Sequence, residues 1–265
     1  MREISELFHT NNILDFGVMD FIEIPKLIEC RAKARLPQDP KSVIVCVFPY
    51  YVGELKGRNV CQYATVIDYH DYIKSTLSNI CGELSLKYNK QFECFVDSSP
   101  IPEVFCAVKA GLGFRGKNNL LITKKYGSYV VLGEIVTDMQ LPPSIANKES
   151  CLNCGQCKTN CPNGAIGLSS VNYSNCVSNI SQRKGELTED EVLAIRRGGF
   201  VWGCDHCQDS CPHNKSVSLT YIQEFIQDVE PILTKDNLDA LIKTRSFGYK
   251  GKKLLERNLE IISKE

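Results

Sequence analysis

No apolar run in this sequence is long enough to span a bilayer, and the residues behind Met1 lack the apolar stretch of a secretory signal. Lysine plus arginine and aspartate plus glutamate each total 31, so no excess of positive charge attracts the chain to nucleic acid or to an anionic membrane. Internal repeats, low-complexity segments and a G-x-x-x-x-G-K-[ST] phosphate loop are also absent. We therefore expect a cytoplasmic protein, and 265 residues are enough for a sizeable core.

Cysteine, in contrast, is abundant, with 14 copies. A first run has the spacing C-x2-C-x2-C-x3-C-P, which is typical of bacterial ferredoxins, and comprises Cys151, Cys154, Cys157 and Cys161. A second run has the same spacing except that its first cysteine lies far upstream, and comprises Cys176, Cys204, Cys207 and Cys211. Eight thiolates are the number that two 4Fe–4S clusters require, so the sequence predicts two such clusters.

The spacing also predicts how the eight cysteines divide. In two-cluster ferredoxins the last cysteine of each run binds the other cluster. One cluster is therefore expected on Cys151, Cys154, Cys157 and Cys211, and the other on Cys161, Cys176, Cys204 and Cys207. Structural zinc favours separated C-x2-C pairs, and a disulfide framework needs a secreted chain, so both alternatives are disfavoured. Most of the other six cysteines lie in apolar patterns and are expected in the core.

Hydrophobic patterns predict a mixture of helices and strands before the cysteines. Helices are expected over residues 1–10, 25–34 and 68–88, the last with apolar residues at helical spacing. Strands are expected over residues 13–19, 42–48 and 91–96, and the unbroken apolar run at 42–48 is typical of a buried strand. Ser98 or Ser99 should cap a helix that begins near Pro100 and ends at Gly111. Residues 120–123 and 128–136 should pair as two strands.

Two further features organise the second half of the chain. Residues 140–150 contain two prolines and are expected to form a linker into the cysteine-rich region. Thr188 and Glu191 form a capping box that predicts a helix over residues 188–197, and the tail from residue 216 is expected to be wholly helical. We therefore expect domains at residues 1–142 and 143–215, followed by a helical tail at 216–265.

Gly111, Gly113 and Gly116 match the dinucleotide-binding pattern G-x-G-x-x-G. That pattern requires a strand before the glycines, a helix after them and an acidic residue about 20 positions later. Here a helix is expected before the glycines and a strand after them, so we do not expect a nucleotide site. Three glycines can still bring the backbone close to a flat, bulky ligand.

Several stretches together resemble epoxyqueuosine reductase, the cobalamin-dependent iron–sulfur family that completes the queuosine base of tRNA. The most specific is Gly-Cys-Asp-His-Cys-Gln-Asp-Ser-Cys-Pro-His-Asn at residues 203–214. The others lie at residues 63–64, 68–70, 96–100, 110–118, 127–129 and 132–135. The match covers roughly residues 10 to 215, a judgement from pattern alone.

The resemblance implies an α+β protein. An N-terminal α/β cobalamin-binding domain, shared in outline with reductive dehalogenases, would precede a two-cluster ferredoxin-like domain and a short helical tail. It implies a reductase that converts epoxyqueuosine in tRNA to queuosine, with electrons from an external flavodoxin or ferredoxin and no membrane partner. The cobalt in this family has no protein histidine below it. The sequence agrees, because the D-x-H-x-x-G signature of histidine-ligated cobalamin proteins fails where Ile73 replaces its glycine.

By motif position, the resemblance makes Asp97 the acid that protonates the epoxide oxygen. The residues implied to contact cobalamin are Asp68, Tyr69, His70, Asp97, Gly113, Gly116, Lys117, Asn118, Ser128, Gly133, Glu134, Ser178, Asp205 and Gln208. A predicted helix N-terminus next to Asp97 favours its carboxylate, whereas burial against a corrin would raise its pKa.

Each of these roles has a simpler alternative. In these alternatives, Asp97 would cap a helix and Lys117 would be a solvated surface charge. Asp205 and Gln208 would hydrogen-bond to the cluster sulfurs. For His70, a hydrogen-bonded structural role is the preferred interpretation.

The sequence also departs from the family pattern. Val104 stands where the family has arginine, Ser98-Ser99 replaces Thr-Gly, and Asn179 replaces a tyrosine. Full-length members carry a C-terminal helical-repeat domain that helps to hold tRNA, and this chain resembles a short form without it. The basic residues at positions 243–257 could contact phosphates or form a solvated helix face. Two other functions therefore stay open: a related reductase acting on another small molecule, and an electron-transfer protein without its own catalysis.

Overall fold

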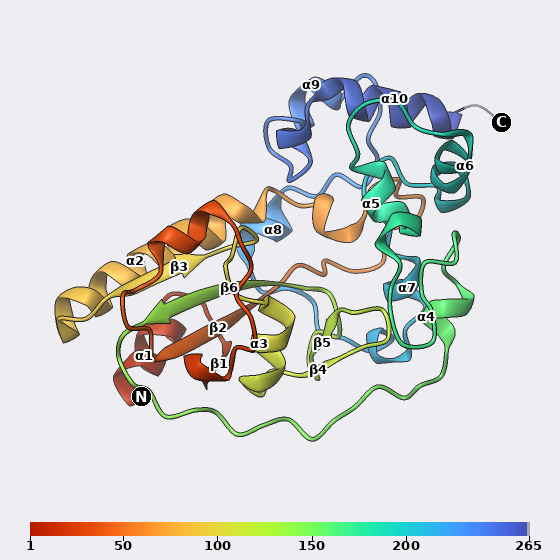
Figure 1. Ribbon diagram of the computed structural model, residues 1–265. Helices are drawn as coiled ribbons and strands as arrows, with labels where there is room; N and C mark the ends of the chain where they lie inside the picture. The colour runs from red at the N-terminus through yellow and green to blue at the C-terminus, as the bar shows by residue number, and fades with distance from the viewer. Residues whose placement is uncertain (264–265) are drawn as a thin grey trace.

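The computed structural model describes residues 1–263, and its N-terminal half is built on a four-stranded antiparallel sheet (Figure 1). The strand order is β1-β2-β6-β3, with bounds Asp15–Asp20 (β1), Ser42–Pro49 (β2), Val130–Thr137 (β6) and Phe92–Phe95 (β3). The central strands β2 and β6 pair from Ser42 opposite Thr137 to Pro49 opposite Val130. The strands expected at residues 13–19, 42–48 and 91–96 are confirmed, with small shifts at their ends.

Strand β2 is buried along its whole length because both faces of the sheet are covered. Ile44 and Phe48 belong to the core formed with helices α1 (Arg2–Thr10) and α2 (Tyr69–Tyr88). Val43 and Val47 belong to the core formed with helix α3 (Glu103–Lys109). Successive side chains of a strand point to opposite faces, so a strand covered on both sides needs an unbroken apolar run.

Helix α2 begins and ends as its sequence predicts. The Asp68 carboxylate caps it by accepting the His70 backbone N–H at 3.0 Å, and Asn89 ends it in the left-handed conformation at φ 51°. A Cβ on Gly133 of β6 would lie 2.7 Å from Leu77 and 2.8 Å from Ile73, both on α2. Glycine at this position therefore lets α2 approach the sheet closely.

Three segment predictions before the cysteines are wrong. Residues 25–34 form no α-helix; 3-10 turns occur at Phe21–Glu23 and Arg31–Arg35 instead. Helix α3 begins at Glu103 rather than near Pro100, because Pro102 disfavours helical geometry in the residue before it. Strand β5 (Leu121–Ile122) pairs with β4 (Phe114–Arg115) and not with β6, although Thr123 and Gly127 form an isolated bridge.

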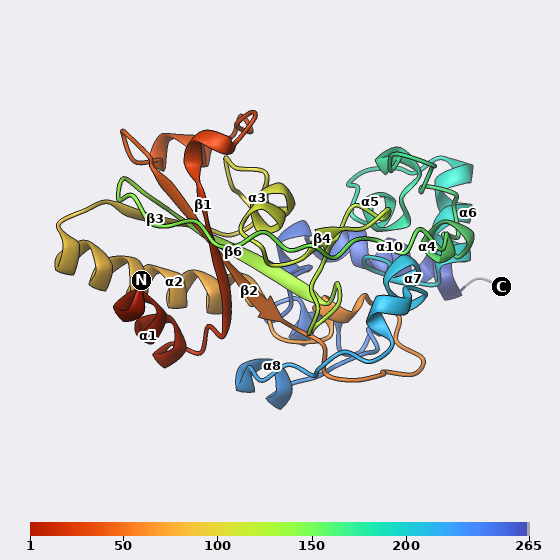
Figure 2. The ribbon, with the colours of Figure 1, turned by 90° about the horizontal axis from the view of Figure 1, so that it is seen from below.

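The cysteine-rich half follows the linker at residues 140–150, which runs extended along one edge of the molecule (green, Figure 1). Its helices are short: α4 (Gln156–Thr159), α5 (Val177–Ser181), α6 (Glu189–Gly198) and α7 (His206–Asp209), with 3-10 turns at Tyr173–Asn175 and Pro212–Asn214. The predicted capping box opens α6, since the Thr188 and Glu191 side chains each accept the other's backbone N–H. Figure 2 shows this half beside the end of the sheet.

The tail after residue 215 contacts both halves. It contains α8 (Gln223–Gln227), α9 (Leu238–Leu241), a 3-10 turn (Gly248–Lys250) and α10 (Lys252–Ser263), joined by non-helical segments, so the wholly helical prediction is wrong. Phe225 of α8 packs against Tyr72 of α2 with ring centroids 5.4 Å apart. Asn258 of α10 donates from Nδ2 to the carbonyls of Ser181 and Val201. Within residues 1–263, every helix is too short or too polar to cross a lipid bilayer.

Candidate active site

The structure gathers the eight cysteines into two sets of four. The first set lines a small cavity and comprises Cys151, Cys154, Cys157 and Cys211. The second set lines a larger cavity and comprises Cys161, Cys176, Cys204 and Cys207. Burial, with smaller contributions from Asp205, Cys176 and Cys161, raises the pKa of Cys204 to about 12. Each set draws cysteines from both runs, in the crossed grouping that the spacing predicts.

The larger cavity has a volume of about 470 Å³ and a mainly apolar lining. Tyr50, Tyr63 and Tyr69 contribute rings, and Val130 and Val131 of β6 contribute aliphatic surface. Hydroxyl and amide groups also line it, from Asn118, Ser128, Ser178, Asn179, Gln182 and Gln208. Of the residues expected to contact a cofactor, Tyr69, Asn118, Ser128, Ser178, Asp205 and Gln208 line this cavity.

Asn118 carries a polar atom without a partner. The residue is buried, and among residues 1–263 its Nδ2 makes no hydrogen bond of good geometry. Asn118 lines both cavities, and its amide faces the Cys207 thiol. Because a buried N–H without an acceptor is costly, this position suits a donor to a group bound in either cavity. Lys117 lines the smaller cavity only.

The Asp97 carboxylate connects to the larger cavity through Tyr69. The Tyr69 hydroxyl donates to Asp97 Oδ2 at 2.7 Å, and His70 Nε2 lies 2.7 Å from the same oxygen. Asp97 adopts φ 53° in the tight turn after β3, and its side chain is 48% exposed. Helix α3 begins only at Glu103, with Pro102 in the N-cap position, so the helix-cap alternative for Asp97 is wrong.

His70 lies between two carboxylates. Its Nδ1 is 2.6 Å from Asp68 Oδ1, and its Nε2 is 2.7 Å from Asp97 Oδ2. Partial burial lowers the pKa of His70, but the hydrogen bonds to Asp68 and Asp97 outweigh burial and raise it to about 10. An imidazolium donates from both nitrogens, which satisfies both carboxylates. His70 therefore holds a proton against Asp97 at neutral pH, in a hydrogen-bonded role rather than as a metal ligand.

Comparison with known proteins agrees with this geometry. A sequence model described as "Epoxyqueuosine reductase QueG, DUF1730" matches residues 31–98, and one described as "4Fe-4S double cluster binding domain" matches residues 150–214. An epoxyqueuosine reductase of Listeria monocytogenes is 35% identical over 284 aligned positions, which cover 97% of this chain and 73% of the relative. The chain belongs to the epoxyqueuosine reductase family. Its cysteine-rich region is a double-cluster domain that carries two 4Fe–4S clusters.

Other epoxyqueuosine reductases differ from this chain in length. The Escherichia coli enzyme is 36% identical, but the match covers 79% of this chain and only 58% of that protein. A solved epoxyqueuosine reductase with an epoxyqueuosine-modified tRNA-Tyr stem loop aligns with a TM-score of 0.82 at 22% identity, covering 98% of this chain and 80% of that one. A catabolic reductive dehalogenase shares the fold in outline, with a TM-score of 0.51 at 13% identity, covering 98% of this chain and 35% of that one.

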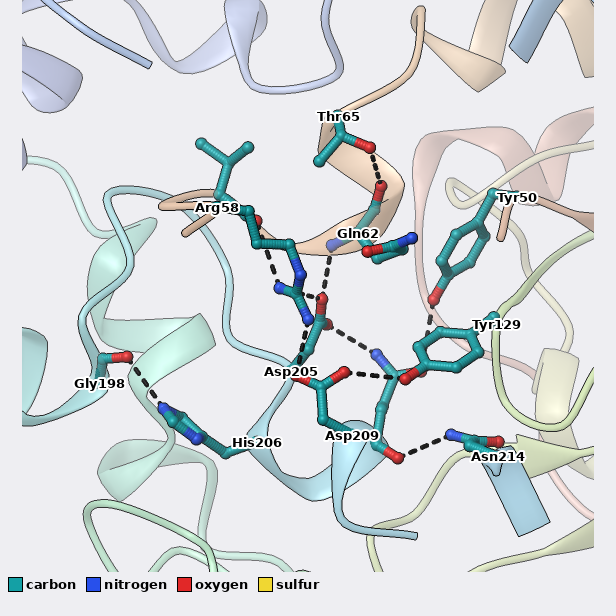
Figure 3. Close-up of polar contacts among 12 residues, drawn as sticks. Tyr50, Arg58, Gln62, Thr65, Tyr129, Gly198, Asp205, His206, Asp209 and Asn214 are labelled. Carbon is teal, nitrogen blue, oxygen red and sulfur yellow. Dashed lines mark hydrogen bonds and ion pairs between the residues drawn. The ribbon is translucent and has the colours of Figure 1, made fainter. Parts of the chain in front are cut away.

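Asp205 belongs to a polar network that joins α7 to the sheet half (Figure 3), and Gln208 bonds to the same network. Arg58 lies 3.0 Å from Asp205 and 2.6 Å from Asp209, while Tyr129 donates to Asp209 at 2.8 Å. Gln208 donates to Asp205 at 2.8 Å and accepts from Ser128 at 3.0 Å. Burial raises the pKa of Asp205, and Arg58 limits that rise. In this family member these two residues line the cavity while their polar atoms hold the two halves together.

Seven residues expected to contact a cofactor line neither cavity: Asp68, His70, Asp97, Gly113, Gly116, Gly133 and Glu134. The first three form the hydrogen-bonded group described above, and the other four have packing roles. A Cβ on Gly113 would lie 2.2 Å from the Ile122 carbonyl oxygen, so this glycine permits the close approach of β5. A Cβ on Gly116 would lie 2.8 Å from the Ile122 side chain. Gly133 packs under α2, and Glu134 is completely buried in the sheet. The glycine motif of this family member therefore brings its own chain segments together.

Several residues of the site were not predicted from the sequence. Tyr50 lines the cavity directly after β2, and Arg58 precedes the 3-10 turn Gln62–Ala64. A polar residue at the end of a buried strand could have indicated Tyr50, but no local pattern indicates Arg58. In the basic tail, the Arg245 side chain is fully buried and pairs with Asp228 at 2.6 Å, so it does not join a phosphate-binding surface.

Proposed function

We propose that this chain converts epoxyqueuosine in tRNA to queuosine, using cobalamin and electrons that pass through its two 4Fe–4S clusters. The observation that carries the proposal is the larger cavity, which is lined by four cysteines and by Tyr69, the hydrogen-bond partner of Asp97. An entry for electrons and a source of protons thus meet at one cavity. The solved relative with a modified tRNA stem loop supports tRNA as the substrate.

We assign the cluster ligands according to the two sets of cysteines. One cluster is held by Cys151, Cys154, Cys157 and Cys211, and the other by Cys161, Cys176, Cys204 and Cys207. Cys154 is exposed, so the first cluster suits electron uptake from an external carrier such as a flavodoxin or ferredoxin. The second cluster, on cysteines that line the larger cavity, would supply electrons there. In this division residues 1–142 form one side of the cobalamin site, residues 143–215 bind the clusters and complete that site, and the remainder is a tail of short helices.

The lining of the larger cavity fits a corrin. Its valines and tyrosines suit the flat macrocycle, while Asn118, Asn179 and Gln182 can bond the amide groups at its rim. His206, the histidine in this lining, has its Nε2 engaged with the Gly198 carbonyl at 3.0 Å, so that nitrogen is not free to bind cobalt. When bound, cobalamin supplies a strongly reducing metal centre.

The side chains around Asp97 supply the protons. Conversion of the epoxide to an alkene consumes two electrons and two protons and releases water. Asp97 donates a proton to the epoxide oxygen, and Tyr69 orients its carboxyl group through the 2.7 Å hydrogen bond. His70, protonated and bonded to Oδ2 of Asp97, supplies this proton to the Asp97 carboxylate. Asp68 holds the His70 ring in place at 2.6 Å.

The test is the Asp97→Asn variant, with Asp71→Asn as the matched control. Asp71 is exposed in the first turn of α2, and its substitution should change nothing. Loss of a general acid costs about 100-fold or more, so D97N should bind iron and cobalamin normally and form queuosine at least that much more slowly. D97N activity near that of the wild type would contradict the role of Asp97.

The wild-type protein distinguishes the other functions. Failure to bind cobalamin would support the electron-transfer alternative. Cobalamin binding without conversion of epoxyqueuosine tRNA would indicate another small-molecule substrate.

A further inference from the structure

Two glutamates lie in the sheet half near Asp97, and the reaction scheme above does not use them. Glu134 of β6 is 0% exposed, and Glu103 is the first residue of α3. Among residues 1–263, neither carboxyl oxygen of Glu134 has a hydrogen-bond partner, and neither does Glu103 Oε1. Two ionised carboxylates offer each other no donor, and an unpaired buried charge is costly. The pair is therefore not fully ionised in the folded protein.

A shared proton resolves this conflict. Burial and then Asp97 raise the pKa of Glu103 to about 8, and burial and then Glu103 raise the pKa of Glu134 well above its usual value. A protonated carboxyl group has an O–H donor, which the neighbouring carboxylate accepts. One proton then satisfies both residues, and it belongs to the pair rather than to either glutamate.

The titratable groups around the glutamate pair include Asp97 and its partner His70. Asp97 and His70 both act on Glu103, and the Ser99 side chain faces Glu134. The other titratable neighbours are Tyr69 of α2, Cys106 of α3 and Cys46 of β2. His70 is the cation of this group, and it is bonded to Asp68 and Asp97.

We propose that Glu103 and Glu134 hold a proton in reserve and pass it toward Asp97 during epoxide reduction. This inference rests on the proposed function, in which each epoxide consumes two electrons and two protons and leaves as an alkene and water. His70 holds one proton against Asp97, and the glutamate pair holds the second. The electrons come from a low-potential carrier through the clusters, and solvent restores both protons. Both glutamates act through Asp97 as positioning residues.

The shared proton can be observed without catalysis. Infrared spectra of the cluster-loaded wild type at neutral pH should show the carbonyl band of a protonated carboxylic acid. The band should shift when glutamate is labelled with carbon-13, which requires no substitution. It should disappear in Glu134→Gln and persist in Glu93→Gln, whose carboxylate is partly exposed on β3. A labelled wild-type protein without this band would overturn the proposal.

Kinetics test whether the proton is used. E103Q and E134Q should lower kcat by roughly 10- to 100-fold without changing KM, whereas E93Q should not. The wild-type rate should fall with rising pH above neutrality as the pair loses its shared proton, and the variants should lack this fall. Unchanged kcat and pH profile in a folded variant would overturn the role.

The two measurements separate this inference from the function on which it rests. If E134Q does not fold, E103Q and the labelled wild type still decide the question. A wild-type protein that shows the band but leaves epoxyqueuosine unconverted would overturn the substrate and support the shared proton.

Discussion

Removing the charge of Arg58 should show how much the polar network around α7 stabilises the fold. The proposed change is Arg58→Met, because methionine retains apolar contact with Phe200, whose ring centre lies 5.1 Å from the guanidinium. The Asp205 side chain is 1% exposed, so it would keep a buried charge without a cation. Asp209 is 44% exposed and can turn to water.

The magnitude follows from the Asp205 contact. Two unit charges 3.0 Å apart attract by roughly 5.5 kcal/mol at an effective dielectric constant of about 20. Desolvation offsets part of this attraction, and breaking a buried pair by removing one partner costs about 3–5 kcal/mol. The exposed contact with Asp209 adds less than about 1 kcal/mol. We therefore expect R58M to lower the free energy of unfolding by about 3–5 kcal/mol.

The assay is anaerobic guanidinium unfolding of the cluster-loaded protein, followed by circular dichroism and by iron–sulfur absorption. The double variant R58M/D205N should recover most of the loss, because the neutral asparagine can still accept the Gln62 backbone N–H. Asp209→Asn alone is the control and should have little effect. The reasoning is refuted if R58M unfolds at the wild-type denaturant concentration, or if the double variant is no more stable than R58M.

The remaining predictions concern helix α2. His70 has a pKa raised from 6.5 to about 10, so its contribution to stability is complete below pH 6.5 and is lost as pH rises through about 10. The thermal unfolding midpoint of His70→Gln should therefore change less with pH across this window than that of the wild type. Equal changes of the midpoint with pH would contradict the ion pairs of His70 with Asp68 and Asp97. Gly133→Ala should destabilise the protein by roughly 1–3 kcal/mol in chemical unfolding because its Cβ would overlap Leu77 and Ile73. Gly82→Ala is the control, since its Cβ meets nothing within 4 Å, and it should stabilise α2 by up to about 1 kcal/mol.

The features that the sequence predicts well are those set by local spacing. Each cysteine run ends in Cys-Pro, at Cys161 and at Cys211. This spacing is enough to predict that the last cysteine of each run joins the other set. The capping box at Thr188 and the burial of β2 likewise depend on a few neighbouring residues. Such features survive in the fold because no distant contact competes with them.

The features that escaped prediction depend on distant partners. A glycine at position 113 indicates close approach, but only the fold shows that the approaching group is the Ile122 carbonyl. Residues 120–123 have strand character, yet β5 pairs with β4, and toward the segment before β6 only the isolated Thr123–Gly127 bridge forms. Glu134 lies in an apolar strand, and nothing nearby in sequence indicates that Glu103 meets it. Pairing across the chain decides each of these cases.

The returning tail has a consequence for how such a protein can evolve. Three contacts join the tail to the cysteine-rich segment: Asn258 donates to the carbonyls of Ser181 and Val201, Arg257 donates to the Gly185 carbonyl, and Arg196 donates to the Ile261 carbonyl. A recombination event that exchanged only the cysteine-rich segment would have to preserve all three junctions at once. We therefore expect the cysteine-rich segment to be inherited together with the tail that packs on it, and not to be exchanged alone.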